Sequence, residues 1–138
     1  MKHMRWIAAA AASILLAACG GGSIDIVHPV KVAGDSLADS GTFGYKFTVQ
    51  GTARTGTGST PIWPEIIASE NFSSLCPHYV ATSVSTFNAN DKCTNYAIGG
   101  GRINNLKDPT SPVSITQQLK AMGAAGFDKN DIVLIDGG

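Results

Sequence analysis

Short, mostly apolar runs predict the strands of this chain. The run VKVA at Val30–Ala33 follows Pro29, a residue that is tolerated at the start of a strand. The run IVLI at Ile132–Ile135 is apolar at every position, which is typical of a strand buried on both faces. The segment CTNYAIGGG, residues 93–101, predicts a further strand that runs into three glycines.

Apolar residues at helical spacing predict a first helix within the segment PIWPEIIASEN, residues 61–71. Pro64 lies in its first turn, where proline is favoured because the N–H it lacks would have no partner there. The expected apolar face consists of Ile62, Trp63, Ile66 and Ile67.

A second helix is predicted within SITQQLKAMGAAG, residues 114–126. Ser114 precedes Gln117 by three residues, which is a capping-box pattern, and Gly126 ends the helix. Its expected apolar face consists of Ile115, Leu119 and Met122. Residues 45–60 and 72–92 show no sustained period and are predicted as loop or irregular structure.

Strands that alternate with helices predict an α/β fold with a parallel sheet covered on both faces. Such sheets bind ligands beyond the carboxyl ends of their strands. Each predicted strand leaves the sheet through glycine, at Gly34, at residues 99–101 and at residues 137–138. Glycine lets backbone N–H groups approach a bound oxygen closely, so this edge is the expected site.

The first 19 residues predict export from a bacterial cytoplasm. Lys2 and Arg5 precede the apolar residues 7–18, a run that is too short to span a bilayer but fits a signal peptide. The stretch LLAACGGGS resembles a lipobox, so Cys19 is expected to carry the lipid that anchors a periplasmic or outer-membrane lipoprotein. The predicted parts are a signal peptide at 1–18, the lipidated cysteine with its tether at 19–29, and a domain at 30–138. An ordinary cleaved signal with an unmodified cysteine is the alternative.

Composition narrows the class of protein without naming a partner. The chain is 43% hydrophobic and 14% charged, which is ordinary for a single globular domain. Ten basic and ten acidic side chains leave no basic surplus for a nucleic acid. Export would expose Cys76 and Cys93 to oxidising conditions, so we expect a disulfide between them. Two reduced, buried thiols are the alternative.

Four segments in order resemble the GDSL esterases and lipases of the SGNH hydrolase superfamily. They are VAGDSLADSG, PIWPEIIA, NYAIGGGR and LIDGG, and together they extend over residues 32–138. The resemblance implies a three-layer, flavodoxin-like α/β fold and hydrolysis of a small-molecule or lipid ester through an acyl-enzyme, without metal or cofactor. It makes Ser36 the nucleophile, and it assigns the N–H groups of Ser36 and Gly100 to the oxyanion hole.

The chain departs from the family pattern in its general base. The family's oxyanion asparagine would follow Gly138, and its closing Asp-x-x-His segment has no counterpart, so residues 30–138 are expected to be the amino-terminal part of the domain. His28 lies before the first strand, about 20 Å from Ser36 along an extended chain. His78 is expected to be a solvated loop side chain. A smaller departure is Thr42, where many relatives have asparagine.

The remaining expectations concern acidic residues and other classes of function. Asp35 and Asp39 are expected to cap or close the turn after the first strand, and Asp136 to lie near the crevice. The alternative for Ser36 is that it is only a turn residue that ends a strand. A nucleotide-binding G-x-G-x-x-G reading fits poorly, because Asn104 stands where the third glycine belongs. A non-catalytic exported lipoprotein with an α/β ligand-binding domain stays open.

Overall fold

The computed structural model describes residues 26–49 and 59–138. The predicted signal peptide, Cys19 and the start of its tether lie outside the described residues, as does part of the predicted loop at 45–60. The elements, in chain order, are β1 (Val30–Ala33), α2 (Trp63–Glu70), β2 (Tyr79–Ala81), β3 (Phe87–Ala89), α3 (Ile115–Ala125) and β4 (Ile132–Ile135). None of the helices in the described part is long and apolar enough to cross a membrane.

Strands β1 and β4 form a small parallel sheet, with Val30 opposite Ile132 and Ala33 opposite Ile135. Both strands have the bounds that their apolar runs predict, and their parallel direction is confirmed. The prediction that β4 is buried on both faces is wrong, because Val133 and Ile135 are exposed. The two strands lie far apart in the sequence. The chain between them, which includes both helices, leads from the end of β1 to the start of β4. The chain is therefore α/β.

The strand predicted within residues 93–101 is wrong as a regular strand. This segment lies beside the other edge of β1, where Val32 N–H donates to the Thr94 carbonyl and Tyr96 N–H donates to the Val32 carbonyl at 3.0 and 2.7 Å. Only an isolated parallel bridge between Val32 and Asn95 results. The Ala97 N–H turns to the side chain of Asn95 at 3.0 Å, and such local bonds compete with a strand ladder.

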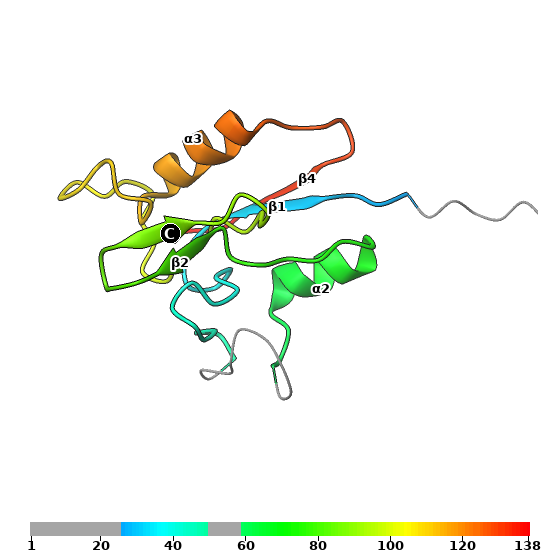
Figure 1. Cartoon of the computed structure of the whole chain (residues 1–138), viewed down its shortest axis with the longest axis horizontal. Coiled ribbons are helices and arrows are strands. Elements are labelled where there is room, and N and C mark those ends of the chain that lie inside the picture. The colour runs from blue at the N-terminus through cyan, green and yellow to red at the C-terminus, as the bar shows by residue number, and fades with distance from the viewer. Residues whose placement is uncertain (1–25, 50–58) are drawn as a thin grey trace, which may run out of the picture.

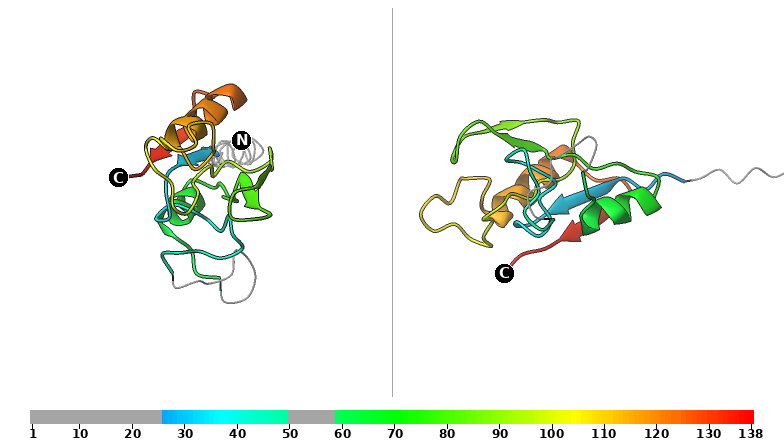
Figure 2. Two further views of the ribbon diagram at one scale, coloured as in Figure 1. Left: turned by 90° about the vertical axis from the view of Figure 1, so that its left-hand side faces the viewer. Right: turned by 90° about the horizontal axis from the view of Figure 1, so that it is seen from below.

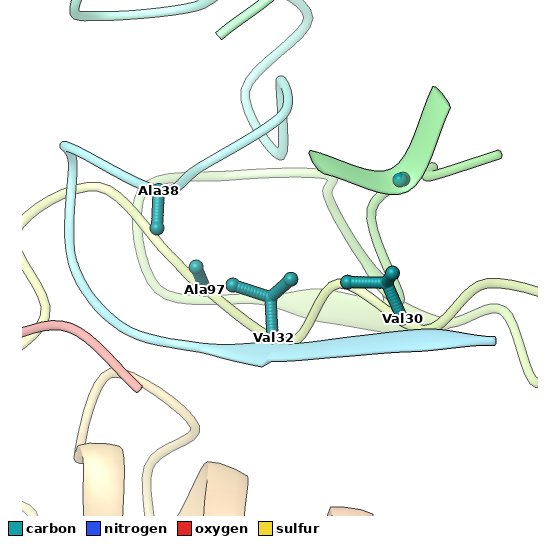
Figure 3. Packing of buried hydrophobic residues seen from close by; sticks show 5 residues of the cluster. Val30, Val32, Ala38 and Ala97 are labelled. Carbon is teal, nitrogen blue, oxygen red and sulfur yellow. The ribbon is translucent and has the colours of Figure 1, made fainter. Parts of the chain in front are cut away.

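Helices α2 and α3 lie on opposite sides of β1 and β4 (Figures 1 and 2). Val30 and Val32 point to the α2 side, where they pack with Ala38, Ala68 and Ala97 (Figure 3). Ala33 belongs to a second cluster, which contains Ile115 and Met122 of α3. Alternate residues of β1 thus serve the two helices, as the period of two in a strand requires.

The two helices bear out their sequence patterns to different degrees. The predicted apolar face of α2 is confirmed only in part: Ile62 is buried, but Trp63 and Ile66 are exposed, and Pro64 and Ala68 are buried instead. The small side chain of Ala68 packs in the same cluster as the valines of β1, whereas Trp63 and Ile66 face solvent. In α3 the predicted face is confirmed, with Ile115 and Met122 buried and Leu119 packed against them at partial burial.

The ends of α3 fall where they are predicted, but the capping box is absent. The helix follows Ser114 as its N-cap residue and stops before Gly126. Ser114 Oγ lies 2.7 Å from Thr116 Oγ1, and the side-chain amide of Gln117 donates to the Pro109 carbonyl at 2.6 Å. Both side chains are thus engaged by groups other than the backbone N–H groups that a capping box satisfies.

The prediction of loop structure throughout residues 72–92 is wrong, because β2 and β3 form an antiparallel hairpin there. Tyr79 pairs with Ala89 and Ala81 pairs with Phe87. A disulfide between Cys76 and Cys93 joins the two ends of the hairpin, with the Cα atoms 5.0 Å apart, as expected from the sequence. The hairpin lies at the end of the molecule toward which β1 runs (Figure 1).

Candidate active site

Ser36 lies half-buried in the turn that follows β1. The Asp35 carboxylate accepts the Leu37 N–H at 2.9 Å, and the Asp35 carbonyl accepts the Ala38 N–H at 3.2 Å. The expectation that Asp35 closes this turn is therefore confirmed. Two bonds from one residue fix the backbone on the C-terminal side of Ser36 at the carboxyl end of the strand.

The glycine loop at residues 99–101 lies directly against this turn. Ile98 N–H donates to the Gly34 carbonyl at 3.2 Å. A Cβ atom at Gly101 would stand 2.8 Å from that same carbonyl oxygen and 3.1 Å from Asp35 Cα, so only glycine fits there. The structure thus brings the loop of Gly100 against the turn of Ser36.

The third predicted exit joins the same edge of the sheet. Asp136 N–H donates to the Ala33 carbonyl at 3.0 Å, directly after β4. A Cβ atom at Gly34 would lie 3.1 Å from the Asp136 carbonyl oxygen. The exits of β1, of the 93–101 segment and of β4 therefore meet at one place, where the sequence predicts the site.

Some N–H groups at this edge have no acceptor among the described residues, and those of Ser36 and Gly100 are two of them. The N–H groups of Leu37, Ala38, Gly99 and Gly101 all donate within the protein. Those of Ser36 and Gly100 donate to no atom of the described residues. Gly100 is exposed and has a φ of +80°, a backbone conformation that favours glycine. These are the two groups that the family resemblance assigns to an oxyanion hole.

The side chain of Asp39 joins the segment after β1 to the glycine loop at residues 99–101. Its buried carboxylate accepts the N–H groups of Gly41 and Thr42 at 2.8 and 2.7 Å, and that of Gly99 at 2.7 Å. Burial raises the pKa of this carboxyl, and the three N–H donors act in the opposite direction. Asp39 closes its turn as expected, and it also anchors the glycine loop of the neighbouring segment.

Two buried polar side chains that the sequence analysis missed complete this scaffold. Asn95 donates to the Ala38 carbonyl at 2.8 Å and to Ser40 Oγ at 2.9 Å. Gln118 of α3 accepts the Gly34 N–H at 2.8 Å. The available signal was a polar residue within an otherwise apolar pattern, because Asn95 lies in a predicted strand and Gln118 is three residues after Ile115 on the helix.

Neither described histidine is a partner of Ser36. His28 lies before β1, and its Nδ1 atom is 3.1 Å from the Asn130 carbonyl oxygen, at the opposite end of the sheet strand from Ser36. The expectation that His78 is solvated is wrong, since its side chain is buried, stacks on Tyr96 and places Nδ1 3.2 Å from the Cys93 carbonyl oxygen. Packing between the hairpin and the 93–96 segment encloses this ring.

The structure also describes Thr42 and Asn104, two other positions singled out in the sequence. Thr42 is buried, and its hydroxyl donates to the Ala97 carbonyl at 3.2 Å, so it binds the 93–101 segment. Asn104, the poor match in the nucleotide-binding pattern, is exposed. In the described ranges no group of three or more His, Cys, Asp or Glu residues could hold a metal ion.

Comparisons with known proteins add no relative of this chain. A scan against family models, a search of curated proteins and a search of solved structures each found no match. The residues themselves are therefore the basis for a function.

Proposed function

We propose that this chain forms the nucleophile side of a serine ester hydrolase of the GDSL type, within a three-layer SGNH fold. The observation that carries the proposal is the pair of N–H groups at Ser36 and Gly100 that lack an acceptor among the described residues, in adjoining loops at the end of β1. Unpaired backbone donors in a turn that also holds a serine hydroxyl are what acyl transfer requires.

In the proposed reaction the Ser36 hydroxyl oxygen attacks the carbonyl carbon of an ester. The hydroxyl proton passes to a general base, and the carbonyl oxygen becomes an oxyanion that receives the N–H groups of Ser36 and Gly100. The alcohol leaves with a proton and the acyl group stays on Ser36. Water then attacks the acyl-enzyme, releases the acid and restores the serine.

The general base is proposed to come from outside the 138 residues of this chain. An unassisted serine hydroxyl is a poor nucleophile near neutral pH and needs a base within about 2.6 to 3.2 Å. His28 and His78 both contact backbone carbonyl groups away from Ser36. By itself, the chain is therefore proposed to be inactive. The proposal also includes export and a lipid anchor at Cys19.

The test compares the 138-residue chain with the complete product of the gene that encodes it, on a short-chain chromogenic ester and on a fluorophosphonate probe. We expect the complete product to hydrolyse the ester and to be labelled at Ser36, and the Ser36→Ala variant to fall to the background rate. Ser85→Ala is the matched control, because Ser85 lies exposed in the hairpin loop.

Two outcomes would contradict parts of the proposal. A folded complete product that shows neither Ser36-dependent turnover nor labelling would favour the ligand-binding lipoprotein. Turnover by the 138-residue chain that Ser36→Ala abolishes would place a base within the chain, with His78 the first residue to test.

A further inference from the structure

An aromatic ring lies against the glycine loop that carries the proposed oxyanion donor. A Cβ atom at Gly99 would stand 2.6 Å from Cζ and 2.9 Å from Cδ2 of Phe47. The ring thus fills the space that a side chain at residue 99 would need, so only glycine fits there. Gly100 is the next residue, and the Phe47 ring therefore lies beside the backbone that presents the Gly100 N–H group.

The segment that carries Phe47 is held in place by a buried ion pair. Lys46 is buried, and its Nζ atom lies 2.6 Å from Glu65 Oε2 and donates to the Thr60 carbonyl at 2.9 Å. On either side of Lys46, the side chains of Tyr45 and Phe47 are 43% and 37% exposed. The backbone is thus anchored between two large rings that remain in contact with solvent.

These two rings belong to a row of aromatic side chains that reaches the β2–β3 hairpin. The centroid distances are 4.9 Å for Tyr45–Phe47, 6.0 Å for Phe47–Phe43 and 6.0 Å for Phe43–Phe87, all in edge-to-face arrangement. The segment after β1, which is cyan in Figure 1, lies beside the hairpin as a result. Phe43, Tyr45 and Phe47 are called the aromatic cluster below.

A cavity of about 300 Å³ lies between the aromatic cluster and the hairpin. Its lining consists of Phe43, Tyr45, Ala81, Thr82, Ser83 and Val84. This lining contains no lysine, arginine, histidine or carboxylate side chain. An uncharged, largely apolar cavity favours a hydrocarbon group over an ionised one, because a charge removed from water without a partner costs free energy.

We infer that the aromatic cluster binds the hydrocarbon group of the ester, and that Phe47 sets the preference for its length. The inference rests on the proposed esterase function for the position of the ester carbonyl. If the Gly100 N–H holds the carbonyl oxygen, a substituent of the ester can extend over Phe47 and Tyr45. Each fully buried methylene strengthens such binding by about fourfold. The substrate class is therefore an uncharged ester with a hydrocarbon chain longer than that of acetate or methanol.

The kinetic test uses the complete gene product and two series of esters. In one series p-nitrophenol carries an acetyl, butyryl or hexanoyl group, and in the other an acetyl group is joined to methanol, butanol or hexanol. We expect kcat/KM to rise with chain length in one series, and Phe47→Ala to lower the ratio of longest to shortest by about tenfold. The series that shows the loss identifies the side of the ester that the cluster holds. A parent ratio in both series would overturn the inference.

Two further variants separate loss of the surface from damage to the glycine loop. The three atoms nearest to the Cβ position of Gly99 all belong to Phe47, so Tyr45→Ala changes the cluster without emptying that contact. It should lower the same ratio. Phe127→Ala is the matched control, because Phe127 is 55% exposed and lies before β4. It should keep the parent ratio, and a loss as large as that of Phe47→Ala would contradict a local binding surface.

A binding measurement distinguishes this inference from the esterase itself. The Ser36→Ala variant of the complete product cannot form an acyl-enzyme, so it can be titrated with butyl butyrate, which has a hydrocarbon chain on each side of the ester. We expect the ring NMR signals of Tyr45 and Phe47 to shift, more than with methyl acetate, and those of Phe127 to stay. Ring shifts in a protein whose parent shows no Ser36-dependent turnover would refute the esterase and support the surface. Turnover without ring shifts would refute the surface alone, and absence of both would overturn both.

Discussion

The edge at the carboxyl end of β1 and the β2–β3 hairpin are neighbouring loop-rich regions that are held together by different forces. At the edge, buried side chains of Asp39, Asn95 and Gln118 bond directly to backbone groups of the turns. In the hairpin, a disulfide and a set of aromatic contacts dominate, including the stack of His78 on Tyr96 with ring centroids 4.2 Å apart.

The difference shows which of the two regions fixes the positions of individual groups more closely. A hydrogen bond fixes both direction and distance, so the polar scaffold sets where each N–H group of the edge points. A disulfide restricts mainly the unfolded chain, and aromatic contacts tolerate a range of geometries. The contacts at the edge therefore fix the directions of backbone donors, whereas those in the hairpin contribute mainly to the stability of the fold.

The largest effect that would test this contrast is expected from Asp39→Ala. The change leaves three N–H groups, of Gly41, Thr42 and Gly99, without their carboxylate. Each buried donor left unsatisfied costs about 1 to 3 kcal/mol, so we expect the free energy of unfolding to fall by at least about 3 kcal/mol. Urea denaturation measures it, with Asp128→Ala as the exposed control. A fall below about 1 kcal/mol would mean that the edge does not depend on this scaffold.

A somewhat smaller effect is expected when the hairpin loses its disulfide. The cysteines are 17 residues apart, and closing a loop of that length stabilises a fold by about 3 kcal/mol in the chain-entropy model. In Cys76→Ser/Cys93→Ser, amide exchange should accelerate in β2 and β3 more than at Gly99, whose N–H is bonded to Asp39. Equal acceleration at both places would break the distinction between the two regions.

The sequence predicts the edge better than the hairpin for physical reasons. Strand β1 is a mostly apolar run between Pro29 and Gly34, and β4 is a run of four apolar residues between two aspartates, so their ends are visible in the sequence. The strands β2 and β3 have three residues each, and these contain no period long enough to recognise. Their pairing depends on contacts across the hairpin, which include Tyr79 against Phe87, and on the disulfide.

The candidate site shows the same division at the level of single residues. The positions of Ser36 and Gly100 follow from glycines at the strand exits, since such exits collect at one edge of a parallel sheet. The roles of Asn95 and Gln118 do not follow, because burial of a polar side chain depends on which backbone groups the fold brings beside it. The prediction for His78 is wrong for a related reason: its burial comes from stacking on Tyr96, which is distant in the sequence.

The smallest effect, and the sharpest comparison, is expected from two glycines that have the same backbone constraint. Gly100 and Gly44 have φ values of +80° and +91°, and a Cβ atom at either position would meet no atom within 4 Å. Alanine at either position should therefore cost about 1 kcal/mol of stability, from backbone strain alone.

Only Gly100 offers an N–H group to the proposed oxyanion, because the Gly44 N–H donates to the Gly41 carbonyl at 2.9 Å. Gly100→Ala should thus slow Ser36-dependent ester hydrolysis by the complete gene product, while Gly44→Ala, equal in stability, should leave kcat/KM unchanged. Since the donor is displaced rather than removed, the loss should stay below the roughly 10² to 10³ that follows removal of an oxyanion-hole donor. Equal rates in the two variants, at equal stability, would remove Gly100 from the site and leave the Ser36 turn as the part of the edge that acts on the substrate.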